Sequence, residues 1–183
     1  MASLINSAGA TGSGSMTIQG PNTNSNQVLT IPDATGTAMV SGNMPAFNAY
    51  TITTQTIATN TFTKIQYNVK TFDTNTNYDN TTNYRFTPTV AGYYQINGNF
   101  AMAGAASGYC QIAIYKNGGQ VASGSGIPNN TNVGGMCFAG TVLFLNGSTD
   151  YVEIYGWQNS GGNLGLQTST GFNTFSGVMV RAA

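Results

Sequence analysis

The stretch FTPTVAGYYQINGNF, Phe86–Phe100, decides the fold class of this chain. A threonine-rich segment leads into a turn at Val90-Ala91-Gly92, after which large apolar and polar side chains alternate. Tyr94, Ile96 and Phe100 share one face, opposite Gln95, Asn97 and Asn99. A period of two residues is typical of a β-strand with one buried face. The stretch therefore predicts a strand, a turn and a second strand that packs on a core.

The same period recurs from Ala46 to the C-terminus, and no stretch shows the 3.6-residue period of a helix. The KNGG sequence at Lys116–Gly119 predicts a hairpin turn, and NGSTD at Asn146–Asp150 predicts another turn. The run Cys137–Leu145 is apolar almost throughout, which predicts a strand covered on both faces. Together these features predict an all-β jelly-roll sandwich of about 8–10 antiparallel strands.

Composition excludes several classes of partner. Charged residues make up 5% of the 183 residues, against about 25% in an average globular protein, and the net charge is zero. The chain therefore lacks the basic surface expected of a nucleic-acid-binding protein. No window approaches the roughly 18 apolar residues of a membrane span, so we expect no membrane insertion. The N-terminus has neither the basic region nor the apolar run of a signal peptide.

The two cysteines, Cys110 and Cys137, have no CxxC spacing, and the chain has no histidine. Zinc binding and thiol-protease chemistry are therefore not expected. The favoured interpretation is two unpaired, buried small side chains within strands. The alternative is a disulfide, which requires adjoining strands at the right separation.

The chain is expected to have two parts. Residues 1–42 begin with the small, linker-like MASLINSAGATGSGS and continue into short extended β pieces within Met16–Val40. These pieces have too few apolar residues for a core of their own, so they should order by joining other chains. Residues 43–183 form the predicted sandwich.

Residues 46–183 resemble the globular head of complement C1q, which is related to the tumour necrosis factor fold. The quoted stretch contributes Phe86, Gly92 and Tyr94, at the spacing that this family shows. IAIYKNGGQV, GTVLFLNGSTDYVEI and FNTFSGVMV follow in the order of the family's central hairpin, long strand and closing strand. The resemblance implies a homotrimeric jelly-roll head.

Residues 24–42, NSNQVLTIPDATGTAMVSG, are similar to segments that recur in bacteriophage tail fibres and other virion proteins. This resemblance implies a tail-fibre or tail-tip adhesin, assembled in the host cytoplasm and located in the virion tail. Residues 1–42 would then attach the head to other tail or baseplate proteins. Two alternatives stay open: a purely structural virion component, such as a head decoration or tail adaptor, and a bacterial surface or spore-coat protein.

An enzyme is not expected. Without histidine, acid–base chemistry would fall on Asp33, Asp73, Asp79, Asp150 and Glu153, and these carboxylates show no convergent pattern. We therefore expect no catalytic residues and no cofactor. Asp73 and Asp79 lie in an Asn-rich loop, which leaves two interpretations: a calcium site, or a solvated loop whose side chains cap its own turns.

We expect the head to bind a host cell-surface polysaccharide through loops at its far end, because neutral amide and hydroxyl groups suit sugar hydroxyls. The candidate receptor-binding residues are Asp73, Asn75, Tyr78, Asp79, Asn129, Asn130, Asn132, Asn163 and Gln167. Strand-borne aromatic residues either stack on sugars or fill the contact between subunits, and the second is favoured. The candidate trimer-interface residues are Tyr93, Tyr109, Tyr115, Phe138, Phe144, Tyr155 and Trp157.

Overall fold

The computed structural model describes residues 22–26, 28, 39–103, 108–126, 135–169 and 171–183. The chain divides into two units, with the boundary between Gly36 and Thr37, a few residues before the predicted boundary at residues 42 and 43. In the first unit, the described residues 22–26 and 28 contain no strand. Most of the β pieces predicted within Met16–Val40 lie outside the described residues.

Strands dominate the second unit, and its only helical element among the described residues is the 3-10 turn η1, Ser41–Asn43. The strands are β1 (Ala46–Tyr50), β2 (Thr56–Ile57), β3 (Thr63–Lys64), β4 (Val69–Asp73), β5 (Tyr78–Asp79), β6 (Arg85–Phe86), β7 (Gly92–Ala101), β8 (Cys110–Lys116), β9 (Gly119–Ser125), β10 (Met136–Leu145), β11 (Val152–Gln158), β12 (Leu164–Gly165) and β13 (Thr174–Ala182).

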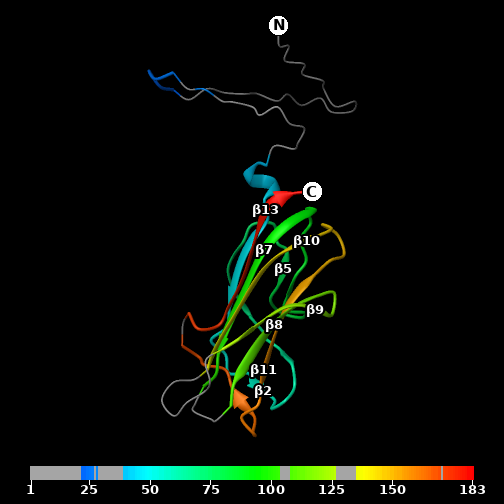
Figure 1. The fold of residues 1–183 in the computed structure, drawn as a ribbon. Helices are drawn as coiled ribbons and strands as arrows, with labels where there is room; N and C mark the ends of the chain where they lie inside the picture. Colours follow the sequence, from blue (N-terminus) through cyan, green and yellow to red (C-terminus); the bar gives the residue numbers. More distant parts are fainter. Residues whose placement is uncertain (1–21, 27, 29–38, 104–107, 127–134, 170) are drawn as a thin grey trace. The chain divides into compact units, whose positions relative to one another are not determined.

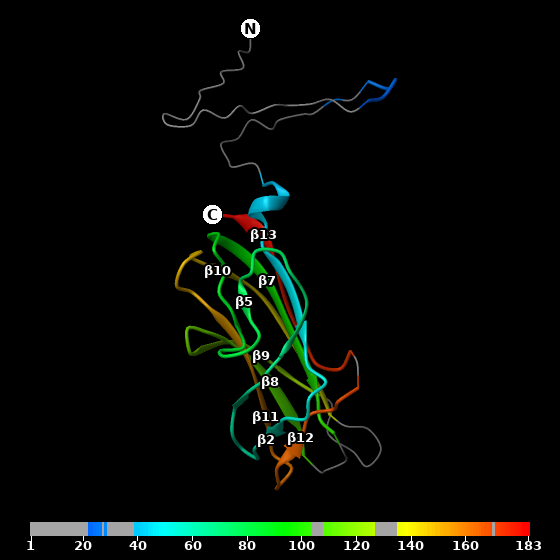
Figure 2. The ribbon, with the colours of Figure 1, turned by 180° about the vertical axis from the view of Figure 1, so that it is seen from behind.

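The strands form two antiparallel sheets that pack against each other (Figures 1 and 2). The five-stranded sheet has the order β10-β7-β13-β1-β4. The second sheet has the order β5-β6-β11-β8-β9, with β3 paired to β11. A small pair, β2 and β12, lies at the end away from the C-terminus. The predicted all-β jelly-roll sandwich is therefore confirmed.

Strand β7 contains most of the stretch that decided the fold. It lies between β10 and β13, and Tyr94, Ile96 and Phe100 are fully buried between the sheets. The Tyr94 hydroxyl donates to the Val90 carbonyl across the preceding turn, at 2.7 Å. The alternation read from the sequence is confirmed, because one face of β7 packs on the core.

Aromatic rings from several strands meet in the core around Phe47. Its ring stacks on Phe86 at 4.4 Å and on Tyr78 at 5.0 Å, and meets Phe175 edge-on at 4.9 Å. Gly177 makes room for this cluster, since a Cβ there would lie 2.7 Å from Phe47 Cε1. The core thus joins β1, β5, β6 and β13 in one packed group.

The two predicted turns are confirmed. Asn117 and Gly118 both have positive φ, 52° and 80°, as the tight turn between β8 and β9 requires. The Asn146 side chain accepts from the backbone N–H groups of Ser148, Thr149 and Asp150 at 2.9–3.0 Å. These side-chain to backbone bonds define the turn between β10 and β11.

The expectation that Cys137–Leu145 is covered on both faces is wrong for this chain. The run forms β10, an edge strand paired only with β7, and its outer face is open. Phe138 is 59% exposed and Val142 is 53% exposed. A continuous apolar run does not distinguish burial within one chain from burial by a second copy, and here the second face has no cover within the described residues.

The favoured interpretation of the cysteines is also wrong, because Cys110 and Cys137 form a disulfide with a Cα–Cα distance of 6.4 Å. The bond joins β8 of one sheet to β10 of the other. Gly126 lies against it, and a Cβ there would come within 2.6–2.7 Å of both sulfur atoms. Sequence spacing could not reveal this pairing, since only the sandwich brings β8 and β10 face to face.

Replacing both cysteines by serine should lower the free energy of unfolding by about 3–4 kcal/mol, as expected for a cross-link over 27 residues. Urea denaturation of the double variant and of the wild type, each with and without reductant, measures this difference. Reductant should destabilise the wild type and leave the variant unchanged. Equal stability of oxidised and reduced wild type would contradict a stabilising cross-link.

Candidate functional site

A shallow, polar hollow of about 450 Å³ lies over β5, β6 and the loops beside them. We call it the Asn-rich hollow, and its lining is Thr76, Asn77, Tyr78, Asp79, Asn80, Thr81, Asn83, Arg85, Thr87 and Thr89. Nearly all of these side chains are neutral amides or hydroxyls, which both donate and accept hydrogen bonds. The hollow therefore offers a polar, uncharged lining over most of its area.

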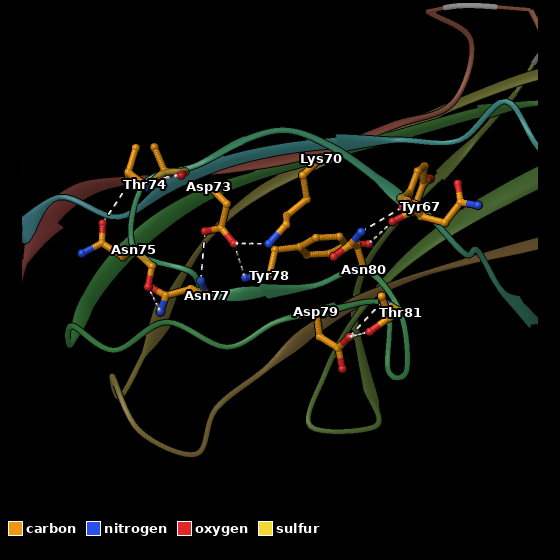
Figure 3. A network of polar contacts seen from close by, with 12 residues as sticks. Tyr67, Lys70, Asp73, Thr74, Asn75, Asn77, Tyr78, Asp79, Asn80 and Thr81 are labelled. Carbon is orange, nitrogen blue, oxygen red and sulfur yellow. Dashed lines mark hydrogen bonds and ion pairs between the residues drawn. The ribbon is translucent and has the colours of Figure 1, made fainter.

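Asp73 fixes the loop that leads into the hollow (Figure 3). Its carboxylate accepts from the backbone N–H groups of Asn77 and Tyr78 at 2.9 and 3.0 Å. The same carboxylate pairs with Lys70 at 3.3 Å. Asp73 thus holds the turn between β4 and β5 in one shape, and its oxygen atoms face the protein.

Asp79 fixes the next turn, between β5 and β6, in the same way. Its carboxylate accepts from the backbone N–H groups of Thr82, Thr81 and Asn83, each at 3.0 Å, and from the Asn83 side chain at 2.8 Å. These bonds, led by the one from Thr82, hold the pKa of the Asp79 carboxyl well below its usual range. The side chain therefore stays ionised while its oxygens serve the loop.

Calcium prefers several oxygen ligands that converge on one point. The Asp73 and Asp79 oxygens face N–H donors instead, as capping side chains do. Among the described residues, no group of three or more Cys, Asp or Glu side chains could hold a metal ion. The geometry favours the capping interpretation of these two residues, and the expectation that the chain has no cofactor stays untested.

Tyr78, a predicted receptor-binding residue, does not present its ring to a ligand. It is 3% exposed, its ring packs in the core, and its hydroxyl donates to the Tyr67 carbonyl at 2.9 Å. Burial is the main cause that raises the pKa of its hydroxyl. Alternation of side chains could not place it, because the two-residue strand β5 is too short to show a period.

Arg85 is the cation of the hollow. Its guanidinium lies 4.4 Å from the centre of the Tyr151 ring, a cation–π contact. Among the described residues it forms no ion pair with a carboxylate, whereas Lys64, Lys70 and Lys116 each form one. Its N–H donors are therefore available to a ligand.

The predicted receptor-binding residues do not gather at one end of the sandwich. Asn75 lies at the end that carries η1 and the C-terminus, where its side chain donates to the Gly42 carbonyl at 3.4 Å. Asn163 and Gln167 lie at the opposite end, beside β2 and β12. Asn129, Asn130 and Asn132 lie outside the described residues. A single far-end site built from all the predicted loops is therefore wrong, because β4 returns the 73–83 loop to the other end.

The predicted interface aromatics divide between the outer faces of the two sheets. Tyr93, Phe138 and Phe144 lie on the five-stranded sheet, where Tyr93 and Phe144 meet at 5.6 Å. Tyr115, Tyr155 and Trp157 lie on the other sheet, and Tyr109 packs on Trp157 at 5.3 Å. The alternation of side chains along a strand predicts which residues share a face of that strand. It does not predict to which of the two sheets the strand belongs.

Sequence reasoning missed several residues of both faces. On the five-stranded sheet Val142 and Val178 are exposed on β10 and β13, near the predicted aromatics, and Phe72 is exposed on β4 at the opposite edge. On the other sheet Phe62 contacts Tyr115 and Trp157. Alternation within β10 and β13 could have indicated Val142 and Val178, whereas Phe62 precedes a strand too short to show a period.

Solved structures with similar folds include murine APRIL. Its crystal structure at pH 5.0 has a TM-score of 0.56 and 9% identity, over 75% of this chain and 99% of that chain. At pH 8.0 the TM-score is 0.55, with 9% identity and the same coverage. Eiger TNF from S. frugiperda has a TM-score of 0.49 and 11% identity, over 76% of this chain and 93% of that chain.

The APRIL comparisons show that the chain shares a jelly-roll fold with those solved structures. At these identities the likeness establishes the fold alone. No protein-family model matches the chain, and no curated protein matches it significantly. In the described part of the chain, no helix is long and apolar enough to cross a membrane.

Proposed function

We propose that the chain is the homotrimeric head of a bacteriophage tail fibre or tail tip, and that it binds a glycan on the host cell surface. Three features support the proposal: the jelly-roll fold, an open apolar face suited to assembly, and a neutral polar surface suited to sugars. The described acids Asp73, Asp79, Asp150 and Glu153 are each held by donors of the chain itself, which supports binding without catalysis.

The observation that carries the assembly is the outer face of the five-stranded sheet, which we call the open sheet face. It presents Phe72, Tyr93, Phe138, Val142, Phe144 and Val178, all more than a third exposed. Apolar patches of this kind mark interaction sites in soluble proteins. Five of these residues lie on the neighbouring strands β10, β7 and β13, and Phe72 lies on β4 at the other edge of the sheet. A second copy of the chain could bury the five together, as in a permanent subunit interface.

The open sheet face also has a shape suited to a partner. A hollow of about 280 Å³ lies between Asn97, Asn99 and Gly140, with Phe138 at its rim. A Cβ at Gly140 would lie 2.8 Å from Asn97 Oδ1, so a larger residue there would displace the Asn97 side chain that lines the hollow. Raised rings beside a hollow allow side chains from two copies to interlock.

The assignment to a virion rests on residues 24–42, which are similar to tail-fibre segments. We propose that residues 1–42 attach the head to other tail or baseplate proteins. Deleting residues 1–42 should leave a folded trimer that no longer loads onto particles, as measured by immunoblot of purified virions. Loading of the truncated chain at the level of the full chain would contradict this role.

Adsorption to cells tests the proposed function. The labelled, isolated full-length trimer should bind susceptible cells and should fail to bind resistant cells that lack surface polysaccharide. Three sites per trimer raise avidity by about 10²–10⁴, so weak individual sites suffice. Because the net charge is zero, binding should change little between low and high salt. Equal binding to both cell types, or to neither, would favour a purely structural virion component.

The disulfide keeps one alternative open, a bacterial surface or spore-coat protein. Disulfides persist in oxidising surroundings, which include both virion surfaces and the bacterial cell exterior. The two cases differ in when the bond forms. Alkylation of producing cells before lysis should trap Cys110 and Cys137 as free thiols for a cytoplasmic virion protein, and as a disulfide for an exported protein.

A further inference from the structure

Five aromatic side chains form a continuous band on the outer face of the second sheet, beside β3, β8 and β11. Ring centres lie 4.3 Å apart for Tyr115 and Tyr155, 6.1 Å for Phe62 and Tyr115, 6.5 Å for Phe62 and Trp157, and 5.3 Å for Tyr109 and Trp157. We call these residues the aromatic track: Phe62, Tyr109, Tyr115, Tyr155 and Trp157. The rings are partly exposed, so they support one another and still present surface.

The aromatic track leads to the Asn-rich hollow. Tyr151 immediately precedes β11, the strand that carries Tyr155 and Trp157, and β11 pairs with β6 beside it. The Arg85 guanidinium on β6 lies over the Tyr151 ring and also lines the hollow. One face of the sheet therefore runs from stacked rings to a polar hollow, and Arg85, which forms no ion pair among the described residues, lies at the boundary.

Charges on this face are balanced. Glu153 pairs with Lys64 at 2.7 Å and accepts from the Tyr155 hydroxyl at 3.2 Å. Asp79 lies opposite Arg85 in the pairing of β5 and β6, with its carboxylate bonded to its own turn. An anionic ligand at Arg85 would be repelled by the Asp79 carboxylate. A neutral ligand with hydroxyl groups would accept hydrogen bonds from Arg85 and from the Asn and Thr side chains without that repulsion.

The two outer faces differ in chemistry, which separates their roles. Apart from Tyr93, the large exposed side chains of the open sheet face are Phe and Val, beside the polar Asn97 and Asn99, and a patch that is mostly apolar suits a subunit interface. The aromatic track is mostly tyrosine and tryptophan, whose rings end in hydrogen-bonding groups, and its neighbours are neutral and polar. Such amphipathic rings suit a ligand with both C–H faces and hydroxyls.

We propose that the aromatic track and the Asn-rich hollow form one binding site for a neutral hexose chain. Sugar rings stack along the track, and the sugar at the end enters the hollow, where Arg85, Asn80 and Asn83 bond its hydroxyls. This inference rests on the proposed glycan-binding function. It extends the predicted site from the 73–83 loop along the side of the sandwich and leaves out the loop that carries Asn163 and Gln167.

Titration calorimetry of the full-length trimer tests the site with three hexamers: β-1,4-linked glucose, α-1,4-linked glucose and β-1,4-linked glucuronate. At least one neutral hexamer should bind with a Kd on the order of millimolar, and the glucuronate should bind at least about tenfold more weakly. Trp157 is the only tryptophan, so stacking on the track should shift the emission of the whole protein. Preference for the glucuronate, or no binding of any hexamer, would overturn the inference.

Variants locate the site. Arg85→Met and Tyr109→Ala should each weaken binding of the neutral hexamer about three- to tenfold, the loss expected for one hydrogen-bonding or stacked group. Asn163→Ala and Gln167→Ala, at the end loops, are matched controls and should bind as the wild type. Weaker binding by the two end-loop variants, together with unchanged binding by the Arg85 and Tyr109 variants, would overturn this site. In that case, adsorption of the wild-type trimer to susceptible cells would still support the proposed function. Circular dichroism of each variant confirms that it is folded.

Discussion

Replacing Val142 by aspartate should convert a trimer of about three times 19.0 kDa into monomers. Val142 lies in the middle of β10 on the open sheet face and is 53% exposed in the single chain. In a trimer each copy would bury one unpaired carboxylate, and a buried charge without a partner costs several kcal/mol. Light scattering at low micromolar concentration measures the mass.

Ile52→Asp is the matched control for this change. Ile52 is similarly exposed, at 46%, but follows β1 and lies outside the strands of the open sheet face. The control should remain a trimer, because its new carboxylate stays in solvent. A wild type that is a stable monomer, or a Val142→Asp variant of unchanged mass, would contradict assembly through this face.

Phe47→Ala should lower the free energy of unfolding by about 3–5 kcal/mol, a large part of the 5–15 kcal/mol that is typical of a domain. Phe47 is 1% exposed, and its ring contacts Tyr78, Phe86 and Phe175 from three other strands. Removing it leaves a cavity that rigid neighbouring rings cannot fill. Urea denaturation at one protein concentration measures the difference.

The exposed Val121, on β9, provides the comparison for Phe47. Truncating it to alanine removes no buried contact, so the expected change is within about 0.5 kcal/mol. If Phe47→Ala were as mild as Val121→Ala, the ring cluster would not be the centre of the core. A loss of several kcal/mol in both variants would instead indicate that β9 is covered in the assembled protein.

The fold class could be predicted from the amino-acid sequence, because short local patterns carry that information. The alternation of Tyr94, Ile96 and Phe100 defines a half-buried strand, and Asn117-Gly118 supports the backbone angles of a tight hairpin. Each of these signals acts over a few neighbouring residues. These signals can be recognised in the sequence before it is known which strands pair.

How distant strands face one another could not be predicted from those local patterns. Cys110 and Cys137 bond because the two sheets stack, and β4 returns Asp73 to the end opposite Asn163. The sequence showed that β10 is apolar, but it could not predict that β10 lies at the edge of its sheet. Burial of one face by the second sheet and exposure of the other depend on strand order, which arises from contacts between residues far apart in the chain.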